Sequence, residues 1–189
     1  MIPVHDVLPV RRTPWLTYLL IAANIVIFLF TPAARTTGVE SVSLAQLCEQ
    51  EAFYDRYSAI PRELIDNEQL SRVPTGESGI GRDGPGCVVA RPKYEKVPVL
   101  SVLFSMFLHG GWLHLLGNML FLWVFGNNIE DRFGKLGFGL FYLFCGYAAA
   151  YAFALFNQDA AAPLAPIVGA VELGSSAACA YNAISPASR

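Results

Sequence analysis

The sequence predicts an all-α membrane protein with about three membrane-spanning helices and a long extracytoplasmic loop. Of its 189 residues, 54% are hydrophobic and only 15% are charged, and the mean hydropathy is +0.42. A typical soluble domain carries about 25% charged residues. The charges are also unevenly placed, because residues 33–96 hold 8 of the 13 Lys and Arg residues and 10 of the 15 Asp and Glu residues. The chain is thus divided into apolar segments and one polar segment.

The first apolar segment runs from Trp15 to Phe30 without a formal charge, and it predicts a span over about residues 14–31. This segment is slightly shorter than the ~20 residues that a helix needs to cross a bilayer. Arg11 and Arg12 precede it. Because basic residues favour the cytoplasmic side of membrane helices, a cytoplasmic N-terminus is predicted. The alternative is a cleavable signal peptide, which also has a basic start and an apolar centre.

The polar segment, residues 33–96, is predicted to be a water-facing loop between two spans. Ala45 to Tyr57 and Pro61 to Leu70 can form short helices, whereas Thr75 to Gly86 is predicted to be a glycine-rich loop. The glycines of this loop precede neither a helix nor a lysine, so we expect no phosphate-binding site there.

Composition argues against two further classes of function. The net charge is −2, and the chain has no basic stripe with interleaved aromatic residues, which argues against a nucleic-acid partner. None of the four cysteines forms a C-x-x-C motif, which argues against a zinc or redox site. Cys48 and Cys87 lie in the polar segment. If that segment is extracytoplasmic they can form a disulfide, and two free thiols are the alternative.

Two further spans are predicted after the loop, over about residues 112–129 and 136–156, with the charged stretch 130–135 as the turn between them. The basic residues of this turn place it on the same side as the N-terminus, which is consistent with two crossings in between. Small residues at a spacing of four in the last helix predict close packing against a neighbour. They are Gly146, Ala150 and Ala154.

Three polar residues lie within the mostly apolar stretch from Met106 to Arg132. His114 and Asn118 are four apart, so on a helix they share one face. His109 precedes a pair of glycines that interrupts regular structure. A polar side chain at membrane depth is costly unless it faces a protein interior or a wet cavity. The pattern therefore favours a functional role.

Three roles compete for these residues. A metal site is disfavoured, because the spacing is not H-E-x-x-H, no carboxylate lies between the histidines, and Asn is a poor zinc ligand. A structural role, in which the side chains hydrogen-bond neighbouring helices, is common in membrane proteins. In a catalytic role, imidazole and carboxamide N–H groups converge on a developing oxyanion, while other elements supply the nucleophile and the base.

The sequence F-L-H-G-G-W-L-H-L-L-G-N-M, followed by G-N-N-I-E-D-R-F-G, resembles the second transmembrane region of rhomboid intramembrane serine proteases. The order of a first span, a long loop, this helix and a Gly/Ala-rich third helix is also similar. The resemblance covers about Arg11 to Ala170. The residues that match the H-x-x-x-x-H-x-x-x-N and E-x-R patterns are His109, His114, Asn118, Glu130 and Arg132.

The resemblance implies a six-helix membrane bundle, of which residues 1–170 would be the N-terminal half, with about three transmembrane helices and a stub. It implies hydrolysis of a peptide bond in or beside a substrate's transmembrane helix, by a serine–histidine dyad and without a metal or cofactor. His114 and Asn118 correspond to side chains near the oxyanion hole. His109 corresponds to an organiser of the loop before the helix, and the E-x-R pair has a structural role. The implied partners are a transmembrane protein substrate and the lipid bilayer, and the oligomeric state is open.

The tail, residues 171–189, departs from the family pattern. Family members continue from a stretch like that ending at Ala170 into serine and glycine, giving G-A-S-G, whereas Val171 stands at the expected serine position here. Ser176 is a displaced alternative nucleophile, and His114 is the last histidine of the sequence. We therefore predict an atypical tail from a truncated or frameshifted reading, and an inactive form of the protease. A non-catalytic pseudoprotease that binds transmembrane helices is the alternative.

Overall fold

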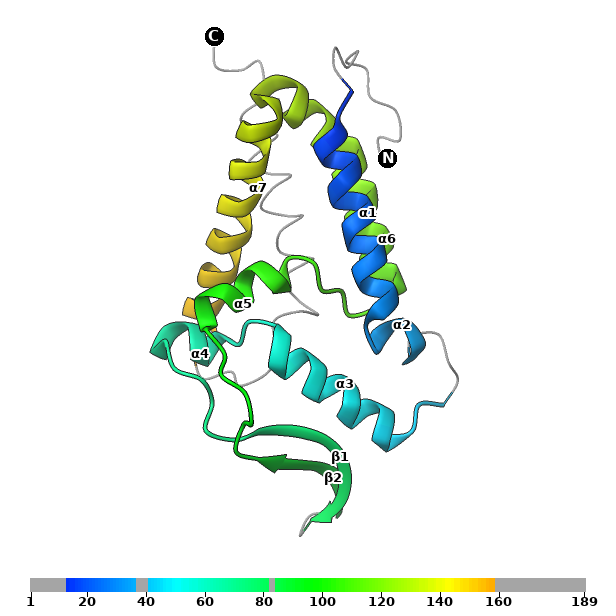
Figure 1. Cartoon of the computed structure of the whole chain (residues 1–189), viewed down its shortest axis with the longest axis vertical. Coiled ribbons are helices and arrows are strands. Elements are labelled where there is room, and N and C mark those ends of the chain that lie inside the picture. Colours follow the sequence, from blue (N-terminus) through cyan, green and yellow to red (C-terminus); the bar gives the residue numbers. More distant parts are fainter. Residues whose placement is uncertain (1–12, 37–40, 82–83, 159–189) are drawn as a thin grey trace.

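The computed structural model describes residues 13–36, 41–81 and 84–158. In this part of the chain, α1 and α6 lie side by side, and α7 returns beside them from a turn at the opposite end from the smaller elements (Figure 1). The predicted tail, with Val171 and Ser176, lies outside the described residues. The elements are α1 Trp15–Phe30, α2 Ala33–Thr36, α3 Leu44–Tyr57, α4 Pro61–Asp66, β1 Val73–Gly81, β2 Gly84–Ala90, α5 Pro98–Ser105, α6 Trp112–Phe121, the π-helix η1 Leu122–Gly126, and α7 Asn127–Phe156.

Helix α1 forms within the bounds that the sequence predicts for the first span. Its residues include no charge, glycine or proline that would interrupt the helix, and Pro14 precedes it, where a missing backbone N–H costs nothing. The helix approaches η1 closely at Gly126, because a Cβ atom there would lie 3.0 Å from Cγ2 of Thr17. The absence of a side chain at Gly126 thus allows η1 to pack closely against α1.

Helices α6, η1 and α7 form one helical run, Trp112–Phe156, that reverses direction at Gly134 (Figure 1). Gly134 has φ 72° and ψ 171°, a conformation that side-chain-bearing residues rarely adopt. The prediction of a turn over residues 130–135 is wrong in its extent, since the helix continues to Phe133 and the reversal is confined to one glycine. The charged residues did not end the helix, because Arg132 is exposed and the buried Glu130 has hydrogen-bond donors in α1.

By length and composition, the run Trp112–Phe156 is the one helix of the described residues that can cross a membrane, and α1 is a shorter apolar helix of 16 residues. Because the run folds back at Gly134, it has two arms of about 22 residues, each about 33 Å long at 1.5 Å per residue. That length matches the ~30 Å hydrocarbon core of a bilayer.

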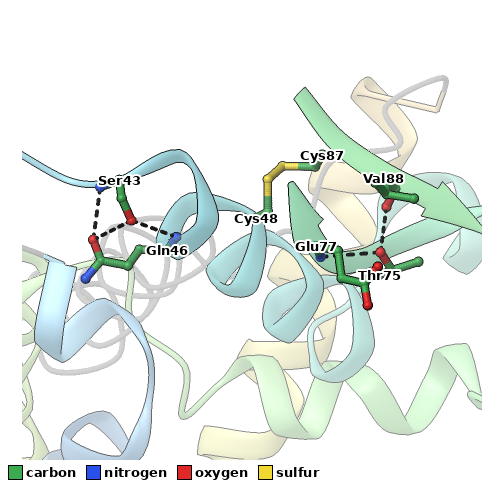
Figure 2. Close-up of a disulfide and its surroundings, with 7 residues drawn as sticks. All are labelled: Ser43, Gln46, Cys48, Thr75, Glu77, Cys87 and Val88. Atoms are coloured by element: carbon green, nitrogen blue, oxygen red, sulfur yellow. Dashed lines mark hydrogen bonds between the residues drawn. A yellow bond between two sulfur atoms is a disulfide. The ribbon is translucent and has the colours of Figure 1, made fainter. Parts of the chain in front are cut away.

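Residues 41–81 and 84–96 form a folded lobe, which contains the two short helices that the sequence predicts, as α3 and α4. Helix α3 begins with a capping box, in which the Ser43 side chain accepts from the backbone N–H of Gln46 and the Gln46 side chain accepts from that of Ser43. Figure 2 shows this cap together with the disulfide that joins Cys48 of α3 to Cys87 of β2. Of the two alternatives that the sequence leaves open for these cysteines, the structure has the disulfide.

The glycine-rich segment predicted as a loop is instead an antiparallel hairpin of β1 and β2, so the protein is not purely α-helical. Ser78 pairs with Cys87, and the Thr75 hydroxyl donates to the carbonyl of Val88 at 3.1 Å (Figure 2). Glycine weakens strands because it has no side chain to pack, and the sequence therefore points away from strands here. The disulfide offsets this weakness by anchoring β2 to α3.

The lobe packs against the membrane-length helices through small residues. Ala150 and Ala154 of α7 are fully buried in one cluster with Ala59, Leu64 and Val102, from the lobe and α5. The predicted stripe of small residues thus serves close packing, and its partners here are α4 and α5.

Candidate functional site

The candidate site begins where two glycines end the loop before α6. Gly111 is the N-cap residue of α6, and Trp112 is its first helical residue. His114 and Asn118 follow in the first two turns of this helix. They lie on one face, because a spacing of four brings residues into register on a helix. This is the arrangement that the sequence predicts for the pair.

Each residue of the pair has a buried polar atom without a hydrogen-bond partner among the described residues. These atoms are Nε2 of His114 and Oδ1 of Asn118. Asn118 is buried and His114 is half-buried. An unpaired buried polar group costs about 1–3 kcal/mol, so this face of α6 is suited to a hydrogen-bonding partner. The amide of Asn can present either its oxygen or its NH₂ group by rotation about its last bond.

His109 lies beside this pair, in the loop between α5 and α6. It is buried, its Nδ1 lies 3.2 Å from the carbonyl oxygen of Phe107, and its ring centroid lies 5.4 Å from that of His114. A neutral His109 that donates from Nδ1 to Phe107 has its Nε2 free to accept a hydrogen bond. The structure therefore brings His109 beside His114 and places Asn118 on the same face of α6 as His114.

The two histidines of this cluster do not complete a metal site with neighbouring side chains. Within the described ranges, no three His, Cys, Asp or Glu residues are grouped closely enough to hold a metal ion. The donors that the cluster offers are imidazole and carboxamide groups, which form hydrogen bonds without a proton transfer. Chemically, the arrangement is suited to binding an oxygen atom that gains negative charge.

The other predicted pair, Glu130 and Arg132, lies just before the reversal at Gly134, at the opposite end of the first arm from the histidines. Glu130 is buried, and its carboxylate accepts from the backbone N–H groups of Leu16 and Thr17 and from the Thr17 hydroxyl, at 3.0, 2.8 and 2.8 Å. Arg132 is exposed and has no hydrogen bond or ion pair within the described part of the chain. Glu130 therefore joins α1 to the turn between the arms.

The lobe supplies a contact that the sequence does not predict. The Tyr54 hydroxyl of α3 donates to the backbone carbonyl of His109 at 2.6 Å. These residues are 55 positions apart, and hydrophobic periodicity reports only on neighbours along one element. The one sequence feature that points to this contact is the presence of a tyrosine in a mostly polar helix.

A protein-family model described as a rhomboid domain matches residues 97–188, a range that includes the histidine–asparagine cluster and the E-x-R pair. This match covers just under half of the chain and supports a member of the rhomboid family. Its rhomboid relatives include three proteins of Arabidopsis thaliana: RHOMBOID-like protein 6, mitochondrial, and RHOMBOID-like proteins 2 and 1, at 28%, 28% and 27% identity. The matches cover 77%, 78% and 77% of this chain and 45%, 44% and 34% of those relatives.

The rhomboid chain thus spans less than half the length of these curated relatives. No solved structure matches it. The family match, the mostly helical fold and the long apolar run together support a membrane protein.

Proposed function

We propose that this rhomboid chain carries the oxyanion side of an intramembrane serine endopeptidase. The observation that supports the proposal is the pair of buried, unpartnered polar atoms of His114 and Asn118 on one face of α6. In a rhomboid-type reaction, a serine hydroxyl attacks the carbonyl carbon of a peptide bond in or beside a substrate's transmembrane helix. Negative charge then develops on the carbonyl oxygen, and N–H donors on the α6 face stabilise it without a metal or cofactor.

The reaction also needs a nucleophile and a base. The sequence of this form departs from the family pattern at the position of the nucleophile. Val171 stands at the expected serine position, and Ser176 is the displaced alternative. A valine side chain has no proton to lose and no lone pair with which to attack. We therefore propose that the 189-residue form does not cleave a transmembrane substrate. Cleavage in liposomes that Ser176→Ala abolishes would overturn this part of the proposal.

Asn118→Ala tests the oxyanion role in a form that can react. The host is a chimera that continues from Ala170 into the G-A-S-G helix and the following helices of an active rhomboid. We expect Asn118→Ala to lower kcat about 100- to 1,000-fold, the usual effect of losing one oxyanion donor. The matched control is Asn128→Ala, on the far side of η1, where the amide donates to the carbonyl of Val124 at 3.2 Å.

Two results of this assay bear directly on the proposal. A chimera that cleaves with Asn128→Ala but not with Asn118→Ala supports it. An active chimera whose turnover is unchanged by Asn118→Ala refutes it, since the amide then has no part in stabilising the transition state. Initial rates of cleavage of a fluorescent transmembrane substrate, measured at saturating concentration, separate kcat from binding.

The membrane arrangement belongs to the same proposal. We propose a multi-pass protein with a cytoplasmic N-terminus, and with the lobe on the extracytoplasmic side, as the N-terminal half of a six-helix bundle. The disulfide between Cys48 and Cys87 supports this placement, because disulfides persist in oxidising compartments. The proposed partners are the bilayer and a transmembrane protein substrate.

A second function of a different class is favoured by Val171. A rhomboid without its nucleophile can retain substrate helices without cleaving them, as a pseudoprotease. Crosslinking of a transmembrane substrate to the 189-residue form, with no cleavage product, supports this alternative. Absence of any crosslink, under conditions where the active chimera gives one, argues against it.

A further inference from the structure

The lobe, which is not part of the helical run, forms a hydrogen bond to the loop of residues 106–111 that contains His109. Tyr54 is 3% exposed, and its hydroxyl donates to the carbonyl oxygen of His109 at 2.6 Å. The Ser58 hydroxyl in turn donates to the carbonyl oxygen of Tyr54 at 2.6 Å, which fixes the last turn of α3. A buried hydroxyl with a single strong acceptor defines the position of that acceptor.

A second hydrogen bond ties the lobe to the same loop. The backbone N–H of Ala59, just after α3, donates to the Ser105 hydroxyl at the end of α5 at 2.6 Å. The loop from 106 to 111 therefore has a contact to the lobe before it begins and another at His109.

The tyrosine ring also lies in the apolar cluster that joins the first helix to the site helix. Its buried members are Phe28, Ala33, Tyr54, Leu108 and Leu115. Leu108 is the neighbour of His109, and Leu115 is the neighbour of His114. Ring and hydroxyl thus act on the same segment, the ring by packing and the hydroxyl by one directed bond.

Tyr54 remains a hydrogen-bond donor at every physiological pH. Burial raises the pKa of its hydroxyl to about 12, and the hydroxyl of Thr31 opposes this shift. The bond to His109 therefore does not depend on the proton concentration in the compartment that the lobe faces.

We propose that Tyr54 is a positioning residue, whose hydroxyl fixes the backbone of His109 and so the orientation of the His109 and His114 rings. What the two rings are positioned for rests on the proposed function. The positioning itself is a property of the 189-residue chain, and it is measurable whether or not the protein cleaves a substrate. It assigns the disulfide-linked lobe a role in organising the site.

Tyr54→Phe tests this role, because it removes the hydroxyl and keeps the buried ring. The first readout is hydrogen exchange of the full chain in detergent micelles, resolved to residues 106–111. We expect exchange there to be about fivefold faster than in the unmodified protein, since one buried hydrogen bond of ordinary strength changes a local opening equilibrium by about that factor. The second readout is the set of ring signals of ¹⁵N-labelled His109 and His114, which we expect to move.

The matched control is Tyr57→Phe, which removes a hydroxyl from an exposed tyrosine on the same helix. That hydroxyl has no hydrogen bond within the described residues, and Tyr57 is 40% exposed. We expect it to leave both readouts unchanged. Ser105→Ala is a second test with Tyr54 intact, and it should accelerate exchange of the same loop by removing the bond from Ala59.

Unchanged exchange and ring signals in Tyr54→Phe would overturn the proposal, as would equal acceleration along the whole of α7, which marks a global loss of stability. If Tyr54→Phe does not fold, Ser105→Ala decides, and unchanged exchange of residues 106–111 in that variant overturns the proposal. The outcome is independent of the cleavage assay. Failure of Asn118→Ala to slow the chimera removes the oxyanion role and leaves the positioning of His109 standing.

Discussion

At the scale of single residues, the lobe contains a buried carboxylate whose charge is not fully compensated. Asp55 is 3% exposed, and its Oδ2 accepts from the Tyr94 hydroxyl at 3.2 Å. Nζ of Lys96 lies 2.6 Å from the Glu63 carboxylate and donates to the backbone carbonyl of Asp55. Because Glu63 pairs directly with the ammonium group, desolvation dominates at Asp55. Burial raises the pKa of this carboxyl to about 6, against an opposing effect of Lys96.

This raised pKa predicts that acid stabilises the lobe relative to the Asp55→Asn variant. Between the unfolded pKa of 3.8 and the folded value of about 6, the folded state binds a proton that the unfolded state does not. The free energy of unfolding therefore rises as the pH falls through 6 towards 4, by up to about 3 kcal/mol, and the contribution is lost above pH 6.

Thermal unfolding of both proteins in detergent, measured between about pH 4 and pH 7, checks this prediction. The difference in stability between the wild type and Asp55→Asn should shift in favour of the wild type as the pH falls. Two parallel pH profiles would show that Asp55 titrates at its ordinary pKa.

At the scale of elements, Glu130 acts as the N-cap of a helix that is distant in sequence. The first backbone N–H groups of any α-helix lack intrahelical partners, and α1 has no side-chain cap of its own, since Pro14 precedes it. The Glu130 carboxylate supplies the missing acceptors for Leu16 and Thr17. A negative charge at this position also interacts favourably with the helix dipole.

We expect Glu130→Ala to lower the free energy of unfolding by about 2–4 kcal/mol, because three hydrogen bonds to one charged group are lost together. The natural control is Arg132→Ala in the same charged stretch, which should change stability by less than about 0.5 kcal/mol. Chemical unfolding in mixed micelles, followed by circular dichroism, measures both. Equal effects of the two substitutions would show that the E-x-R pattern acts as a unit, contrary to the contacts seen here.

The contrast between elements shows how far the sequence predicts this fold. Helix α1, the two arms around Gly134 and the shared face of His114 and Asn118 follow from periodicity and apolar length, which are local properties. The hairpin does not, because its glycine-rich strands depend on pairing and on a disulfide across 39 positions. The bond from Tyr54 to His109 is equally non-local. Sequence thus predicts which residues lie on the site helix, and it does not predict what positions them.

At the scale of the whole molecule, the membrane-length helices have different structures at their two ends. The disulfide-linked lobe lies at one end of the membrane-length helices, and the start of α1 lies with the reversal of the helical run at the other end (Figure 1). The arms between the ends have membrane length. In the proposed membrane arrangement, the two ends therefore face opposite sides of the bilayer, and the lobe is on the oxidising side.

Single cysteines at two exposed positions test this arrangement. Glu68→Cys lies in the lobe and Lys135→Cys just after the turn, both on a background in which Cys145 and Cys179 are replaced by alanine. In intact cells, a membrane-impermeant maleimide should label position 68, and it should label position 135 only after the membrane is opened. Both sites are exposed, so a difference between them reports on sidedness. Labelling of position 135 in intact cells would contradict the proposed orientation. Labelling of position 135 alone would also place the disulfide outside the oxidising compartment.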